Sequence, residues 1–324
     1  MAITLARMGP LKRLRYALEG AALRGLAGVV RRLPHRLMLG LADAVAWTLV
    51  RVMGEDKRVA LANLDIAFGD ARSADEKAVI FRAAVRNLCR TLVGLLWSPN
   101  VGRDNLDQFV LIDPVEEARV RATMAGGRGV IFITPHYGNW ELSCLMLGYR
   151  GVPMTIVAEP TKNPALSALV NDLRSRSGHR VIEPKYAVLK LMKALARGEA
   201  TAMVADVNGR RRRGGVWSDF FGLKVFNGSG LAELALRTNA AIIAGVGVPL
   251  PDGRVRVRLT GEITAPRTGD HAADVQALTD AYTRVVEGVI RDAPEHWLWT
   301  YKRWKRRPGP EQGAYPFYSR YQKV

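Results

Sequence analysis

The chain has 324 residues, 48% of them hydrophobic, so it can bury a sizeable core, and intrinsic disorder is excluded for most of its length. A chain of this length has room for about two domains, although large α/β folds often form around one core. Its only cysteines, Cys89 and Cys144, each lie in an apolar periodic segment. A disulfide framework is therefore not expected, and a reducing compartment fits.

The strong positive charge indicates an acidic or anionic partner. Lysine and arginine number 48 against 30 acidic residues, which gives a formal net charge of +18. Nucleic acid, an anionic membrane and an acidic protein all qualify. Residues 1–60 hold eleven of these cations against four acids, interleaved with leucine, valine and alanine, and the tail from Trp297 holds seven against one. Basic residues among apolar and tryptophan side chains favour an anionic membrane surface over nucleic acid.

The N-terminal part is expected to be helical and to associate with a membrane. Two helices are predicted over 11–52, broken at Pro34, with arginines beside leucines as in an amphipathic anchor. Residues 37–50 are the most apolar early stretch, but Asp43 interrupts them and they fall short of the roughly 20 residues that span a bilayer. No cleavage site of a secretory signal is recognised. A helical hairpin packed on the main domain is the alternative.

The rest of the chain predicts an α/β fold with a mixed central sheet flanked by helices, because short apolar strands alternate with helices from about residue 106 onward. We divide the chain into an N-terminal helical segment (1–70), a catalytic α/β domain (71–307) and a C-terminal tail (308–324). The expected strands are 107–112, 129–134, 152–158, 200–205, 241–248 and 254–260. The expected helices after the first two are 56–67, 75–97, 114–125, 139–149, 163–177, 185–196, 229–238 and 271–292.

Familiar cofactor and metal motifs fail on inspection. Gly209 and Gly214 have the spacing of a P-loop, but Gly215 stands where the motif requires lysine. No cluster of histidine, cysteine and acidic residues has the spacing of zinc ligands. We therefore expect no metal and no tightly bound cofactor.

The segment around His136 carries the chemistry. Residues 129–134 read as a buried strand that Pro135 ends, and Asn139 is a plausible N-cap of the next helix. This places His136 in a strand-to-helix loop and Glu141 in the first helical turn. A neutral imidazole can take a proton from an alcohol, a carboxylate can orient it, and N–H groups at the helix start can bind an oxyanion. From the residues alone, a loop histidine followed by a helix-terminal charge is the alternative.

The segment Thr134-Pro135-His136-Tyr137-Gly138-Asn139-Trp140-Glu141 resembles the His-x4-Asp/Glu motif of glycerolipid-type acyltransferases. More narrowly, it is similar to the version in the bacterial late lipid A acyltransferases, the lauroyl/myristoyl transferase family. The likeness covers nearly the whole chain, because further segments match that family at 60–68, 81–88, 162–166, 214–222 and 297–303.

The resemblance implies transfer of a fatty acyl group from an acyl-carrier-protein or coenzyme A thioester to a hydroxyl of a glycolipid. It also implies the cytoplasmic face of the bacterial inner membrane, with His136 as the base, Glu141 as its support and Asp206 as a further member of the site. A thioesterase or lipid hydrolase using the same base is an alternative. So is a basic membrane- or nucleic-acid-binding protein without catalysis.

Other residues are candidates for substrate binding or for simpler roles. Arg210, Arg211, Arg212 and Arg213 read as a clamp for phosphates or as a solvated loop. Asn139, Lys162 and Asn163 either touch a substrate or belong to helix starts. Trp297, Trp299, Tyr301 and Trp304 alternate with cations, a pattern that fits a membrane interface, stacking on bases or packing.

Two positions depart from the resemblance. Val207 stands where relatives usually carry glutamine after the aspartate, and Glu159 stands where they usually carry arginine. An arginine suits phosphate or carboxylate recognition and a glutamate repels both. The usual acceptor is therefore in doubt, whereas the reaction type is less affected.

Overall fold

The computed structural model describes residues 9–185, 187–210 and 214–322. Its α-helices are α2 (Pro10–Arg32), α3 (His35–Val52), α4 (Gly54–Phe68), α5 (Ala74–Trp97), α6 (Pro114–Ala125), α7 (Trp140–Tyr149), α8 (Pro164–Ser175), α9 (Ala187–Ala196), α10 (Gly230–Thr238) and α11 (His271–Asp292). Its strands are β1 (Val110–Ile112), β2 (Val130–Thr134), β3 (Met154–Val157), β4 (Arg180–Ile182), β5 (Ala200–Val204), β6 (Val216–Phe220), β7 (Leu223–Asn227), β8 (Ala241–Pro249), β9 (Val255–Ile263), β10 (Arg306–Arg307) and β11 (Arg320–Tyr321).

The central sheet is mixed, which confirms the expected fold class. Its seven strands lie in the order β1-β9-β8-β2-β5-β3-β4. The run from β8 to β4 is parallel, whereas β9 is antiparallel to β8 and pairs in parallel with β1. The expected helices and six strands are present. Three features were not expected: β4, which has three residues at the sheet edge, the separate hairpin of β6 and β7, and the short pair of β10 and β11.

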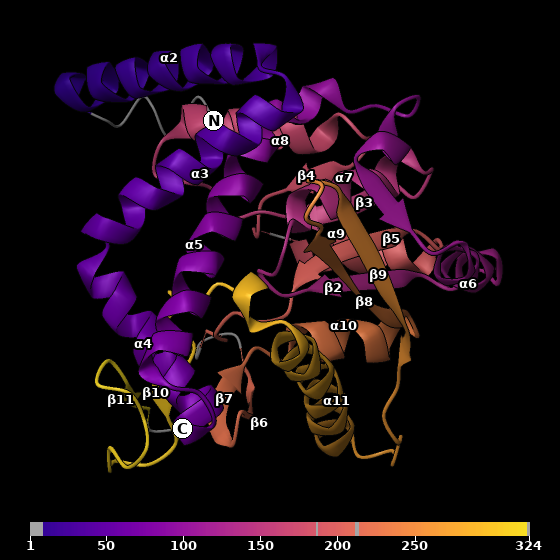
Figure 1. Cartoon of the computed structure of the whole chain (residues 1–324). Helices are drawn as coiled ribbons and strands as arrows, with labels where there is room; N and C mark the ends of the chain where they lie inside the picture. Colours follow the sequence, from indigo (N-terminus) through magenta and orange to yellow (C-terminus); the bar gives the residue numbers. More distant parts are fainter. Residues whose placement is uncertain (1–8, 186, 211–213, 323–324) are drawn as a thin grey trace.

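Helices cover both faces of this sheet (Figure 1). Successive side chains of a strand point to opposite faces, so β2 contributes to two cores. Val130 and Phe132 pack in the core that includes Met146 of α7, on the face that α6 and α7 cover. Ile131 and Ile133 face the other core, which is closed by α9, α10 and α11.

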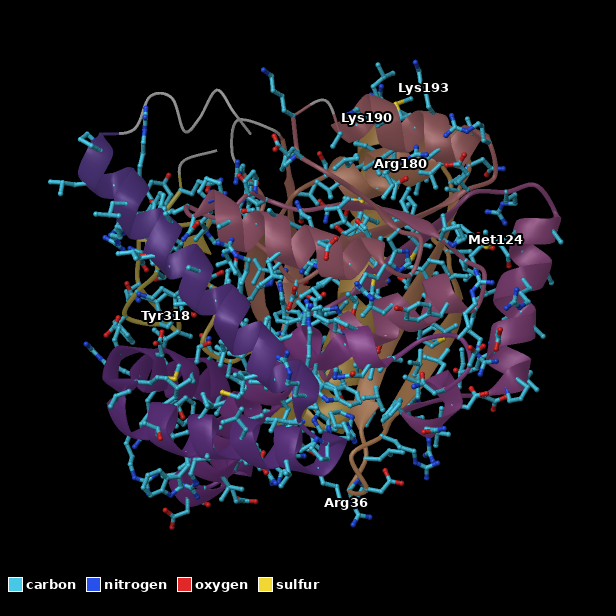
Figure 2. All side chains as sticks on the ribbon, turned by 90° about the horizontal axis from the view of Figure 1, so that it is seen from above. Arg36, Met124, Arg180, Lys190, Lys193 and Tyr318 are labelled. Atoms are coloured by element: carbon cyan, nitrogen blue, oxygen red, sulfur yellow. The ribbon has the colours of Figure 1, made fainter. Side chains whose placement is uncertain are left out.

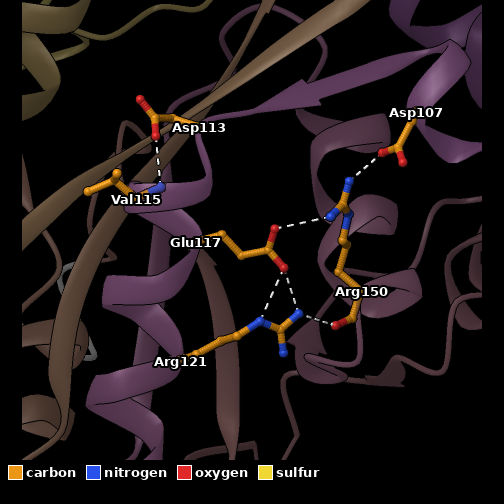
Figure 3. Close-up of polar contacts among 6 residues, drawn as sticks. All are labelled: Asp107, Asp113, Val115, Glu117, Arg121 and Arg150. Carbon is orange, nitrogen blue, oxygen red and sulfur yellow. Dashed lines mark hydrogen bonds and ion pairs between the residues drawn. The ribbon is translucent and has the colours of Figure 1, made fainter.

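An ion-pair cluster holds α6 against the end of α7, the helix that begins with Trp140 and Glu141. Asp113 caps α6 by accepting the Val115 N–H at 2.8 Å. Glu117 accepts from Arg121 at 2.6 Å and from Arg150 at 3.2 Å, and Arg150 also pairs with Asp107 (Figure 3). The cluster joins two helices on the same face of the sheet and so fixes the C-terminal end of α7.

The N-terminal helices stand beside the sheet (Figure 1). Asp43 of α3 accepts paired hydrogen bonds from Arg86 and Arg90 of α5, at 2.6 to 2.8 Å. Burial alone would raise the pKa of Asp43, but these two guanidinium groups lower it to about 2. The carboxylate therefore stays charged at physiological pH and ties α3 to α5.

Helix α2 is mostly exposed and lies across α8, as Figures 1 and 2 show. The two helices approach closely at Gly20, where an added Cβ would lie 2.7 Å from the Ala165 Cβ. Asn163 at the start of α8 donates to Glu19 of α2 at 2.8 Å. The absence of a side chain at Gly20 therefore permits this crossing.

Among the described residues, no single helix is long and apolar enough to cross a membrane. The segments His35–Val52 and Gly54–Ala71 reach that length and composition only as a pair, and they are bent by 89°.

The tryptophans near the C-terminus belong to the core. Trp297, Trp299 and Trp304 are fully buried, and the rings of Trp297 and Trp299 meet edge to face with centroids 4.7 Å apart. The indole N–H of Trp299 donates to the Pro294 carbonyl at 2.7 Å. The readings of these tryptophans as a membrane-interface belt or as base-stacking groups are therefore wrong, because a side chain without exposed surface contacts neither lipid nor nucleic acid.

The Gly20 crossing gives a matched pair of variants on one helix. Leucine at Gly20 collides with α8 and should cost about 1–3 kcal/mol of unfolding free energy or release α2. A Cβ added at Gly25 meets nothing within 4 Å, and leucine there should be neutral or slightly stabilising, because leucine favours a helix over glycine. Chemical denaturation and limited proteolysis of residues 9–33 measure both effects. Equal behaviour of the two variants would show that α2 does not rest on α8.

Candidate active site

Strand register brings His136 and Asp206 together. β2 pairs in parallel with β5, and Thr134 at the end of β2 lies opposite Val204 at the end of β5. His136 and Asp206 each follow these residues by two positions, so both leave the same edge of the sheet. The Ala205 N–H donates to the Thr134 carbonyl at 3.0 Å, which continues the pairing into the loops.

The loop that carries His136 is pressed against β8. The N–H of Gly138 donates to the His296 carbonyl at 2.9 Å, and that of Asn139 donates to the Gly247 carbonyl at 2.8 Å. Gly138 has φ of +56°, and a Cβ there would lie 1.8 Å from the Gly247 oxygen. Only glycine fits this position, because both the backbone conformation and the contact exclude a side chain.

The Asp206 carboxylate is buried and receives three hydrogen bonds. Its Oδ1 lies 3.0 Å from Nδ1 of His136, and its Oδ2 accepts from the His136 backbone N–H and from Nε1 of Trp297, each at 2.8 Å. A carboxylate on Nδ1 fixes the tautomer that leaves the lone pair on Nε2. The imidazole is partly exposed and is therefore accessible from the cavity described below.

The pair favours ionised forms of both residues. Burial alone lowers the pKa of His136, but the charge and hydrogen bond of Asp206, with a further effect of Glu141, raise it above the usual value. Burial would raise the pKa of Asp206, yet the His136 charge and the hydrogen bonds it receives hold it below the usual value. This arrangement stabilises an imidazolium when the ring takes a proton.

Glu141 is held by an arginine. Arg174 of α8 donates from Nε to Oε2 of Glu141 at 2.9 Å and from Nη2 to Oε1 at 2.5 Å. The indole of Trp140 donates to Oε1 at 3.2 Å, and its ring meets that of His136 edge to face with centroids 5.3 Å apart. Glu141 thus lies beside His136, but the carboxylate that contacts the imidazole belongs to Asp206.

A cavity of about 140 Å³ opens beside these groups. It lies between the sheet and α7. His136, Trp140, Glu141 and Arg174 form its polar part. The rest of its wall is mainly apolar and includes Phe132, Cys144, Leu147, Met154, Ile156, Ala202, Val257 and Leu259. Such a space suits a hydrocarbon chain whose polar end reaches His136.

The other candidate binding residues lie outside the wall of this cavity, as far as the structure describes them. Asn139 caps α7 by accepting the Leu142 N–H at 3.0 Å, and Asn163 caps α8 by accepting the Ala165 N–H at 2.9 Å. Lys162 is exposed before α8. Arg210 forms an exposed ion pair with Glu159 at 3.2 Å. Arg211, Arg212 and Arg213 lie outside the described residues.

Two residues of the site were missed from the sequence. Arg174 is one arginine among several near the end of a predicted helix, and no spacing rule distinguishes it. Trp297 was noticed only as part of an aromatic and basic pattern. Contacts with Glu141 and Asp206 across 33 and 91 positions identify both residues.

The Asp206 contact predicts how His136 titrates. In Asp206→Asn the negative charge is removed and burial still opposes protonation, so the pKa of His136 should fall. NMR titration of labelled histidine measures this shift, with the exposed His271 as internal control. An unchanged His136 titration in the folded variant would contradict the pairing.

Residues 10–306 match the family model described as bacterial lipid A biosynthesis acyltransferase. The lipid A biosynthesis lauroyltransferase of Escherichia coli K12 is 23% identical over 290 residues, which are 88% of this chain and 90% of the relative. The phosphatidylinositol mannoside acyltransferase of Mycolicibacterium smegmatis is 25% identical over 282 residues, 85% of this chain and 88% of the relative. The chain therefore belongs to the bacterial lipid A biosynthesis acyltransferase family and is an acyltransferase.

Proposed function

We propose that this acyltransferase moves a fatty acyl group from an acyl-carrier-protein or coenzyme A thioester to a hydroxyl of a membrane glycolipid, with His136 as general base. The observation that carries the proposal is the His136–Asp206 pair beside an apolar cavity. The cavity receives the hydrocarbon chain, and its polar part positions the thioester carbonyl near the imidazole. The names of the relatives support a lipid A or glycolipid acceptor.

The proposed reaction is a proton transfer coupled to acyl transfer. Nε2 of His136 takes the hydroxyl proton while Nδ1–H donates to Asp206, which stabilises the imidazolium. The acceptor oxygen attacks the thioester carbonyl, the tetrahedral intermediate collapses, and the carrier thiolate leaves and recovers the proton. The backbone N–H groups of Trp140 and Glu141, in the first turn of α7, are the proposed oxyanion donors, because a first helical turn leaves its N–H groups without intrahelical partners.

Glu141 supports the reaction in two ways in this proposal. Its charge favours the imidazolium form of His136. Its paired contact with Arg174 also fixes that guanidinium along the cavity wall, beside the place of the reacting carbonyl. This role differs from direct orientation of the imidazole, which Asp206 performs by its hydrogen bond.

Substitution of the base tests the mechanism. His136→Ala should lower the rate of acyl transfer by about 10²–10⁴-fold, the usual contribution of a general base. The fold should persist, because the side chain is partly exposed. His271→Ala, which changes an exposed histidine at the start of α11, is the matched control and should retain full activity. Near-normal transfer by purified His136→Ala would remove the mechanism.

The same assay separates transfer from hydrolysis. Loss of the acyl thioester is measured with and without acceptor lipid, and we expect it to be much faster with acceptor. Equal rates would assign the same base to a thioesterase or lipid hydrolase instead.

We also propose that α2 and α3 bind an anionic membrane surface, at the cytoplasmic face of the inner membrane. Both helices present large apolar side chains to solvent, among them Leu11, Leu14, Leu18, Leu37 and Trp47. Their exposed apolar surface alternates with arginines, which is the composition of an interfacial helix. Such contact would bring the cavity close to its lipid acceptor.

Charge substitution of one exposed leucine tests the membrane contact. Leu18 on α2 is 62% exposed and Val115 on α6 is 66% exposed. Leu18→Glu should weaken binding to vesicles containing anionic lipid, because a carboxylate replaces an inserting side chain. Val115→Glu, on a helix away from α2, should not. Equal binding by both variants, or binding to duplex DNA in preference to vesicles across a salt series, would count against membrane contact through α2.

A further inference from the structure

Arg303 is a buried cation without a carboxylate partner among the described residues. Its side chain is 1% exposed. It donates from Nη2 to Oδ1 of Asn227 at 2.5 Å and from Nη1 to Oδ1 of Asn208 at 3.5 Å, and its guanidinium lies over the Phe220 ring at 5.2 Å. Its Nε has no hydrogen-bond partner in the part of the chain that the structure describes. Two amide oxygens and one ring therefore solvate a full positive charge.

Such a charge is costly to bury, because its hydration is lost and neutral amides replace it only in part. Packing alone does not account for it, since a neutral side chain of similar length would fill the space at lower cost. Burial lowers the pKa of Arg303, and the strongest opposing effect is the charge of Asp206. The buried cation and the carboxylate that contacts His136 therefore attract each other.

The backbone around Arg303 also holds the loop that follows Asp206. The Asn208 N–H donates to the Tyr301 hydroxyl at 2.9 Å, and the Asn208 amide donates to the Lys302 carbonyl at 3.0 Å. Trp297, six residues before Arg303, donates to Asp206 itself. One C-terminal segment therefore contacts the carboxylate and the loop behind it.

We propose that Arg303 is a positioning residue for the acyl-transfer reaction. It holds the Asp206 loop through Asn208 and Asn227, and it adds a buried positive charge to the surroundings of the His136–Asp206 pair. The inference rests on the proposed function only for its effect on rate. The ionisable groups that surround this arrangement are His136, Glu141, Arg174, Asp206, Tyr282, Tyr301, Tyr318 and Arg303.

The positive charge of Arg303 predicts the direction in which the pKa of His136 moves when that charge is cancelled. A cation near the His136–Asp206 pair disfavours the binding of a proton to it. Cancelling that cation makes the pair hold its proton to higher pH, so His136 becomes available as a base only at higher pH. The acidic limb of the rate profile and the titration of His136 should both move upward.

Asn227→Asp is the sharpest test, because it keeps the shape of the side chain and places a carboxylate on Nη2 of Arg303. It neutralises the cation while supplying an ion pair, so the fold should be kept. The His136 titration, followed by NMR without substrate, should move up by about one pH unit, within the range that charges at such distances produce. Arg303→Met should move it in the same direction, whereas Arg303→Lys should stay close to wild type.

Arg128→Met is the control for a general change of net charge. Arg128 pairs with Glu262 and precedes β2, at the opposite end of the strand from His136. It should leave the titration unchanged. An unmoved His136 titration in folded Asn227→Asp would overturn the role of Arg303 as a charge, and so would an equal shift in Arg128→Met. Because this readout needs no acyl donor, it stands apart from the test of the reaction: absence of acyl transfer by the wild-type protein would overturn the proposed function alone.

Discussion

The buried Asp206 carboxylate is the group on which the arrangement of the site depends. It accepts hydrogen bonds from the imidazole and the backbone of the His136 loop and from the Trp297 indole. A buried carboxylate is stable only when its oxygens are satisfied. The same contacts that satisfy it therefore join the end of β2, the end of β5 and the C-terminal segment, and hold the imidazole in one orientation.

The second charged pair of the site is Glu141 with Arg174. The sequence motif suggests that Glu141 supports His136, but in the structure another carboxylate contacts the imidazole. The His-x4-Glu spacing places Glu141 in the first turn of α7, after the loop of His136, but both oxygens of the glutamate accept hydrogen bonds from Arg174. Asp206, in the loop that follows β5, orients the imidazole by its hydrogen bond. The site thus has one carboxylate that contacts the imidazole and another that fixes a guanidinium at the wall of the cavity.

The basic residues of the chain lie in several different surroundings. Some cations form ion pairs within the chain: Arg86 and Arg90 bind Asp43, and Arg174 binds Glu141. Arg210 is paired with Glu159 at the surface, so a carboxylate lies beside a candidate phosphate ligand. Cations of α2 and α3 lie near exposed leucines, and the proposed membrane contact rests on this arrangement. The net charge alone does not show which cations form ion pairs within the chain and which lie near exposed leucines.

The sequence by itself determined the class of fold, most element positions and the loop of His136, because apolar periodicity, proline breaks and helix caps are local signals. The expected helices at 114–125 and 271–292 match α6 and α11 in both bounds. Resemblance to a family added Asp206. The tertiary structure alone decided which carboxylate meets the imidazole, that Arg174 holds Glu141, that Trp297, Trp299 and Trp304 are core, and that the buried Arg303 contacts the loop that follows Asp206. These facts depend on strand register and on contacts between distant segments, and a local pattern of residues does not encode either one.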